Sequence, residues 1–102
     1  MKNTLPGEIW RVDFGMAAEV SPALILSDYP GDDELAVLVV IPHTTAVRSN
    51  RWELQISKPF LKPGVFHLQR IQPISLSRFD ARLGLLTQQE RKRSAHSIAK
   101  AC

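Results

Sequence analysis

The side chains best suited to act on an anion lie where a valine-rich apolar run ends, at residues 43 to 45. Thr44 and Thr45 follow that run, so their hydroxyls are expected at a strand end that faces a loop. A hydroxyl there can donate a hydrogen bond to a phosphate oxygen, or it can simply cap the strand end. His43 titrates in a useful range and could donate a proton, but alternation along the strand would point it away from Thr44.

A second group of residues combines positive charge with aromatic rings. This pattern suits single-stranded RNA, because cations hold phosphates and rings stack on bases. The group consists of Arg48, Arg51, Lys58 and Lys62, which flank Trp52 and Phe60. We expect Arg48 and Arg51 to contact RNA, whereas Trp52 alternates with polar residues and is expected in the core. The basic run from residue 91 to 93 is interpreted as a solvated helix face.

Charge is distributed unevenly along the 102 residues, whose formal net charge is +3. Residues 1–40 contain seven acidic and two basic residues, and residues 41–102 contain eleven basic and three acidic ones. The basic part indicates either an anionic partner, meaning a nucleic acid or an acidic peptide, or a solvated surface without a partner. The three histidines are scattered and the single cysteine is the last residue, so we expect no metal site, no cofactor and no internal disulfide.

No segment has the length and composition of a membrane span. The longest strongly apolar run, residues 35–41, falls far short of the roughly 20 residues that a spanning helix needs. The first residues lack the apolar stretch of a signal peptide, so a cytoplasmic protein is the simplest expectation. With 44% hydrophobic residues, the chain is expected to form one domain over residues 1–102.

Short runs of alternating or continuous apolar residues predict a series of strands, at residues 8–14, 23–27, 35–41, 52–56, 65–71 and near 73–76. A short helical turn is expected at 77–83, followed by a helix from residue 88 to about 100. Thr87 and Glu90 fit a capping box at its start. The apolar face of this helix is thin, which predicts weak anchoring. The pattern describes a mainly β protein, a small antiparallel barrel over about 7–76 with a helical part over about 77–101.

Five segments in series resemble one family. Residues 7–14 resemble the opening strand of the MazF/PemK toxins, which are endoribonucleases of type II toxin–antitoxin modules. Residues 22–27 resemble their second strand, and residues 39–45 the strand that ends in a Pro-x-Thr-(Ser/Thr) motif. Residues 65–74 resemble the strand with an Asp-Gln-(Ile/Val)-Arg-like segment, and residues 82–87 the approach to the last helix. The resemblance implies an SH3-like barrel of the MazF/PemK/CcdB-like type, usually a homodimer.

The resemblance also implies which residues act on RNA. The family's Thr or Ser after the third strand is matched by Thr44, but the arginine that precedes the proline of the second strand is replaced by Ser21. Serine has neither the permanent charge nor the planar fork with which arginine binds a phosphate. A metal-independent endoribonuclease that cleaves single-stranded mRNA, weakened or inactivated at Ser21, is therefore implied. Glu19, in the preceding loop, is interpreted as a solvated carboxylate.

Three classes of function remain open at this point. The first is a toxin-type endoribonuclease that an antitoxin with an acidic tail neutralises, and the second is a barrel that binds RNA or that tail without catalysis. The third and weakest is a translation-associated barrel. The strand end at residues 43–45 distinguishes the toxin family from this third class. In the first two classes the RNA contacts are expected at Thr45, Arg48, Arg51, Lys58 and Lys62.

Overall fold

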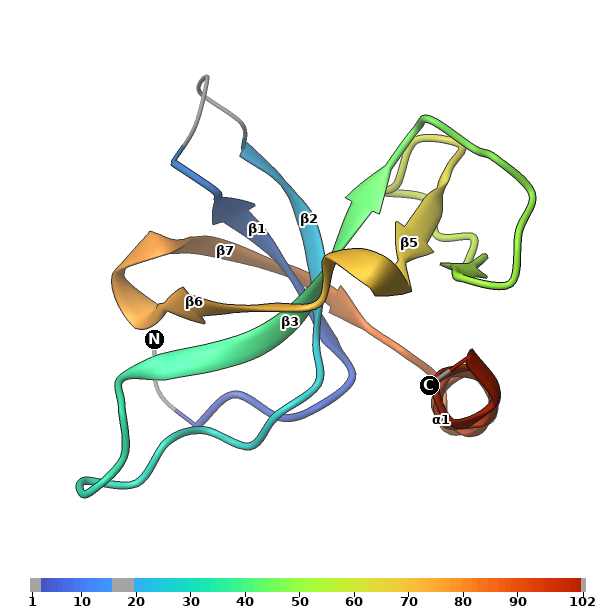
Figure 1. Ribbon diagram of the computed structural model, residues 1–102. Coiled ribbons are helices and arrows are strands. Elements are labelled where there is room, and N and C mark those ends of the chain that lie inside the picture. The colour runs from blue at the N-terminus through green and yellow to red at the C-terminus, as the bar shows by residue number, and fades with distance from the viewer. Residues whose placement is uncertain (1–2, 16–19, 102) are drawn as a thin grey trace.

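Three central strands form the frame of the computed structural model, which describes residues 3–15 and 20–101: β1 (Glu8–Asp13), β2 (Val20–Ile25) and β3 (Val37–Thr44) (Figure 1). They pair antiparallel, in the order β3-β2-β1. β7 (Phe79–Leu85) extends the sheet beyond β1, and β5 (Val65–His67) and β4 (Glu53–Leu54) extend it beyond β3. β6 (Gln72–Ser75) pairs with the first half of β3. The expected mainly antiparallel β structure with a C-terminal helix is confirmed.

Both faces of the central strands carry buried residues, and each face has its own apolar cluster. Ile9, Leu24 and Ile41 belong to the first cluster, which also contains Leu54 and Phe66 from β4 and β5. Side chains on the opposite face of the same strands form the second cluster, together with Ile74 of β6. This cluster consists of Val12, Ala23, Ile25, Leu38, Val40 and Ile74. Successive side chains therefore point to alternate faces along these strands, but both faces carry apolar residues, as in a sheet that is covered on both sides.

The segment from residue 65 to 76 bends within the stretch 65–71, where a continuous strand was expected. β5 pairs with the end of β3, at His43 and Thr44, whereas β6 pairs with its beginning, from Val37 to Val40. A 3₁₀ turn, η1 (Leu68–Arg70), connects these two antiparallel stretches. The chain follows the bend of the sheet by this turn, and the side chains of η1 are thereby brought to the level of the β3 end.

The helical turn expected at residues 77–83 is wrong. Only a 3₁₀ turn, η2 (Leu76–Arg78), precedes β7, which pairs with β1. Phe79, Ala81 and Leu83 are half-buried while Asp80 and Arg82 are exposed. This period of two is typical of a strand. The segment forms a strand because the edge of β1 offers it a hydrogen-bonding partner. The helical part of the chain is therefore α1 (Gln88–Ala101) rather than the whole of 77–101.

Helix α1 has the expected capping box. The Thr87 backbone N–H donates to the Glu90 carboxylate at 2.8 Å, and the Glu90 N–H donates to Thr87 Oγ1 at 3.1 Å. Its apolar face is thin, since Ile98 and Ala101 contribute to the first cluster only as partly buried residues. Weak anchoring does not follow from this, because polar contacts also dock the helix. Arg93 Nη2 donates to the Gln55 carbonyl oxygen at 2.7 Å, and Glu90 forms an ion pair with Lys58.

Candidate functional site

The register of β2 against β3 brings two predicted site residues together. Ala23 lies opposite Pro42, and continuing this antiparallel register by two residues sets Ser21 opposite Thr44. Both residues line one groove with a volume of about 790 Å³. Thr45 and Lys62 line the same groove, so four of the predicted residues meet there.

Thr44 is half-buried at the end of β3, and its hydroxyl is oriented by the chain that follows. Its Oγ1 accepts a hydrogen bond from the Ala46 backbone N–H at 3.1 Å. Because this bond uses the oxygen as an acceptor, the hydroxyl hydrogen remains able to donate to a ligand in the groove. Thr44 therefore shapes the strand end and also lines the groove, and its contact with a phosphate stays a prediction.

His43 lines the groove with a ring that is packed into the core. Its side chain is buried, and its ring packs edge-on against Phe66 with 5.0 Å between ring centroids. Burial lowers the pKa of His43, so the ring is held neutral and its protonated form is disfavoured. Its Nε2 is buried without a hydrogen-bond partner among the described residues. Strand alternation predicts a ring that points away from Thr44; the ring does pack against Phe66, but His43 also lines the groove that contains Thr44.

Sequence reasoning missed Arg70, which also lines the groove. It ends η1, and its side chain is exposed with no ion pair or hydrogen bond to another residue of the described ranges. The prediction of a continuous strand through residue 71 obscured it, because the bend after β5 turns Arg70 toward the end of β3. With Lys62, Arg70 gives the groove two cations on the described chain, while Ser21 contributes none.

Arg48 and Arg51 belong to the next loop and are not part of the groove lining. The guanidinium of Arg51 lies over the ring of Trp52, 4.8 Å from its centroid. Trp52 is half-buried and packs against the first apolar cluster, as the sequence predicted. Arg48 is exposed. Contacts of both arginines with RNA stay predictions.

Glu53 holds the loop that carries these arginines. Its carboxylate accepts hydrogen bonds from the backbone N–H groups of Arg48 at 2.6 Å and Ser49 at 2.7 Å. Ser49 adopts φ 57°, a left-handed conformation that closes the turn around the carboxylate. The bond from Arg48, the largest effect, lowers the pKa of Glu53 together with the bond from Ser49.

Lys58 is the predicted RNA contact with the least free surface. Its Nζ lies 2.7 Å from Glu90 Oε1, and 15% of its side chain is exposed. The lysine charge is thus already neutralised by a glutamate from α1. No local pattern predicts this pairing, since residues 58 and 90 lie far apart along the chain.

Gly64 packs directly against the end of β3. A Cβ atom on this glycine would collide with the Thr44 carbonyl oxygen and would lie 2.8 Å from His43 Cε1. The absence of a side chain therefore allows the loop after Lys62 to close onto the strand end that carries Thr44.

Two further properties concern the described ranges, 3–15 and 20–101. Within them, no group of three or more His, Cys, Asp or Glu side chains is placed to hold a metal ion. No helix in this part of the chain is long and apolar enough to span a membrane. Glu19 lies outside the described residues.

The family model of PemK-like, MazF-like toxins of type II toxin–antitoxin systems matches residues 5–101. Since this match covers nearly the whole chain, the protein belongs to that family of toxins. No curated protein matches the sequence.

Solved structures with the same fold include the following three, all of low sequence identity. A mycobacterial endoribonuclease in complex with its cognate antitoxin is 21% identical, with a TM-score of 0.76 over 99% of this chain and 94% of that one. The Mycobacterium tuberculosis toxin MazF-mt6 is 23% identical, with a TM-score of 0.77 over 92% and 94%. The MazE–MazF structure from Deinococcus radiodurans matches with 16% identity and a TM-score of 0.77, over 99% and 96%.

Replacing Gly64 by alanine should disturb the end of β3 that carries Thr44. The added methyl would displace either the loop or the Thr44 carbonyl, so we expect Gly64→Ala to lower the free energy of unfolding by about 1–3 kcal/mol, as overpacking does. Chemical denaturation measures this change. Gly31→Ala is the control, because the nearest atom to its added Cβ would be an oxygen of the flexible Asp33 carboxylate, at 3.3 Å, and no backbone atom would be in contact. Equal stability of the two variants would show that Gly64 is not under this constraint.

Proposed function

We propose that this protein is the endoribonuclease of a toxin–antitoxin pair and that its groove holds single-stranded mRNA. The observation that carries the proposal is the meeting of Ser21, Thr44, Thr45, Lys62 and Arg70 in one groove of about 790 Å³. Hydroxyls and cations are the groups that bind phosphate oxygens. The endoribonucleases among its structural relatives and its membership of the toxin family support this reaction class.

The reaction needs little from the protein besides positioned donors. RNA supplies its own nucleophile, because the 2′-OH can attack the adjacent phosphorus once its proton is removed. The pentacoordinate phosphorane carries extra negative charge, and the 5′ oxygen leaves with a proton to give a 2′,3′-cyclic phosphate and a 5′-OH. In this scheme Thr44 donates to a phosphate oxygen, while Lys62 and Arg70 add positive charge nearby. Dependence on the 2′-OH makes DNA a non-substrate.

A non-catalytic barrel is the second candidate, and Ser21 is the observation that favours it. The register sets Ser21 opposite Thr44, which is where the family places an arginine. A neutral hydroxyl there cannot stabilise the phosphorane as a fixed cation would. We therefore expect this chain to bind RNA or an acidic antitoxin segment and to cleave RNA weakly or not at all, with any residual rate depending on Arg70.

The variant Ser21→Arg tests this assignment. A well-placed charged donor changes the rate by about 10²–10³-fold, so we expect Ser21→Arg to raise RNA cleavage by that factor and to arrest growth on induction. Adding Thr44→Ala to this variant should abolish the gain, and adding Arg70→Ala should reduce it less. The assay uses a long single-stranded RNA in a chelator, with the natural chain alongside. Cleavage by the natural chain at the rate of Ser21→Arg would contradict the assignment of position 21.

The antitoxin is expected to occupy the RNA groove. The basic second part of the chain, which carries Lys62 and Arg70, attracts an acidic tail as it attracts phosphates. RNA and antitoxin should therefore compete, and added salt should slow the association of either one, because charges at the rim mainly set the association rate. Anisotropy of labelled RNA, titrated with the cognate antitoxin, measures this. Unchanged RNA affinity at saturating antitoxin would exclude a shared groove. Because messenger RNA and the antitoxin are found in the cytoplasm, we propose the same location for this protein.

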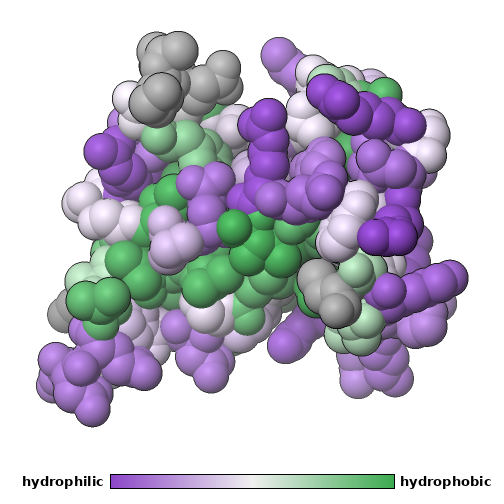
Figure 2. All heavy atoms as spheres, viewed as in Figure 1, coloured by the Kyte–Doolittle hydropathy of each residue, from purple (hydrophilic) through white to green (hydrophobic). Residues whose placement is uncertain are grey.

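The face of β3 and β6 opposite the second cluster suits a second copy of the chain. Val37 and Val39 are half-buried there, Pro73 lies beside Val39 in the register, and Ile71 is 36% exposed. Leu35, just before β3, is 80% exposed. Figure 2 shows hydrophobic atoms gathered across this face, with hydrophilic ones around them. An uncovered apolar sheet face that can pair with its own copy by a twofold axis is typical of homodimers.

Charges introduced on this face should separate the dimer. We expect the natural chain to be a homodimer at micromolar concentration and Leu35→Asp/Ile71→Asp to be a monomer, because burying a carboxylate at the interface costs more than the lost apolar contact. Light scattering gives the mass, and circular dichroism checks the fold. Leu85→Asp is the control, since Leu85 is 54% exposed on β7, outside this face. A natural chain that stays monomeric over this range would exclude the dimer.

A further inference from the structure

The loop from residue 58 to 64 forms one wall of the groove, and other parts of the fold hold it in place. Phe60 and Lys62 are its groove-lining residues. The ring of Phe60 covers Gly84 of β7, where an added Cβ would lie 2.7 Å from the ring. Gly64 closes the loop onto Thr44 at its far end. The start of the loop has a different anchor, which is the ion pair between Lys58 and Glu90.

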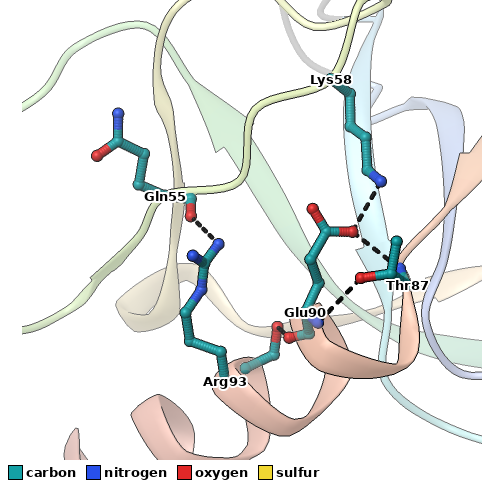
Figure 3. Close-up of polar contacts among 6 residues, drawn as sticks. Gln55, Lys58, Thr87, Glu90 and Arg93 are labelled. Atoms are coloured by element: carbon teal, nitrogen blue, oxygen red, sulfur yellow. Dashed lines mark hydrogen bonds and ion pairs between the residues drawn. The ribbon is translucent and has the colours of Figure 1, made fainter.

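The carboxylate of Glu90 binds both the start of α1 and the start of the loop at residues 58–64 (Figure 3). Its Oε1 accepts from the Thr87 backbone N–H at 2.8 Å and from Lys58 Nζ at 2.7 Å. In the close-up, the carboxylate lies between the loop lysine and the first turn of α1. The capping box of α1 and the anchor of the groove loop thus share an oxygen atom. Arg93, one turn later, donates to the Gln55 carbonyl and ties α1 to the chain just before the same loop.

The pair is shielded from solvent more than most ion pairs on protein surfaces. The side chains of Lys58 and Glu90 are 15% and 20% exposed. Burial alone would raise the pKa of Glu90, but the hydrogen bonds from Lys58 and Thr87 outweigh it and lower the pKa, so the carboxylate stays charged at neutral pH. A shielded charged hydrogen bond constrains both side chains more tightly than an exposed pair.

We propose that Glu90 is a positioning residue for the RNA groove: through Lys58 it fixes the loop at residues 58–64 and thereby sets the place of Phe60 and Lys62 over the bound strand. Helix α1 then supports the site without touching it. The part that concerns RNA rests on the proposed function, whereas the fixing of the loop does not.

Glu90→Gln is the decisive variant, because glutamine keeps the acceptor for the Thr87 N–H and loses the charge that binds Lys58. The substitution makes the protein more positive, so electrostatics alone would strengthen RNA binding. A positioning role predicts the opposite, with RNA affinity falling about tenfold, within the usual range for coupling through a contact network. Affinity is measured by anisotropy with a labelled single-stranded RNA on the natural chain and the variant. Equal or tighter binding by Glu90→Gln would overturn the proposal.

Two further variants separate positioning from stability and from charge. Thr87→Ala removes a cap bond but leaves the ion pair, so it should lower the melting temperature and leave RNA affinity unchanged. Lys58→Met should weaken binding, and adding Glu90→Gln to it should weaken binding no further, since both break the same contact. Lys92→Met is the matched loss of one exposed lysine charge and should have a smaller effect. Additive losses in the double variant would count against the shared contact.

Amide hydrogen exchange without RNA tests the loop independently. Exchange should quicken across residues 58–64 in Glu90→Gln and Lys58→Met, and not in Lys92→Met. Unchanged exchange in the first two would overturn the proposal whether or not the chain binds RNA. A loosened loop in a protein whose natural form binds no RNA would leave the anchor standing and refute the proposed function instead.

Discussion

The antiparallel register between β2 and β3 is the constraint on which the site depends. With Ala23 opposite Pro42, the start of one strand and the end of the next reach the same edge, so that Ser21 and Thr44 face one groove. The register is fixed because the side chains on both faces of these strands are buried, and a slip by one residue would exchange the two clusters. Packing of the core, rather than any contact within the groove, therefore determines which side chains can meet a phosphate.

Two of the loops around this edge are each held by a glutamate. Glu53 binds backbone N–H groups of the loop before it, and Glu90 binds Lys58 at the start of the loop that carries Lys62. Both carboxylates have lowered pKa values, so both bonds are present near neutral pH and weaken as the pH falls through those values. A basic surface is thus shaped by a few acidic residues that neutralise little of it.

The sequence predicted features that depend on local patterns. Alternation or a continuous apolar run located the first three strands, and the capping box at Thr87 and Glu90 began the helix at the right residue. Residues 79–85 also alternate, but a helical turn was expected at 77–83, because the pairing of this segment with the edge of β1 has no local signature.

Contacts between segments that are distant along the chain could not be predicted from the sequence. The sequence assigned Lys58 to RNA because its charge was visible and its pairing with Glu90, 32 positions later, was not. Arg70 was overlooked for the complementary reason, since only the bend between β5 and β6 brings it to the groove. The apolar face of α1 was judged correctly as thin, yet the polar contacts of Arg93 and Glu90 that dock the helix have no sequence signature.

The central claim, that the edge shared by β2 and β3 is the RNA site, is tested most directly by nuclear magnetic resonance. Amide signals of the natural chain are followed while a single-stranded RNA is added, under conditions of slow cleavage. The predicted result is that the largest shifts fall on Ser21, Thr44, Thr45 and the residues around Lys62 and Arg70, with little change in α1. Shifts confined to the basic turn of α1 at residues 91–93, with the strand edge unchanged, would contradict the claim.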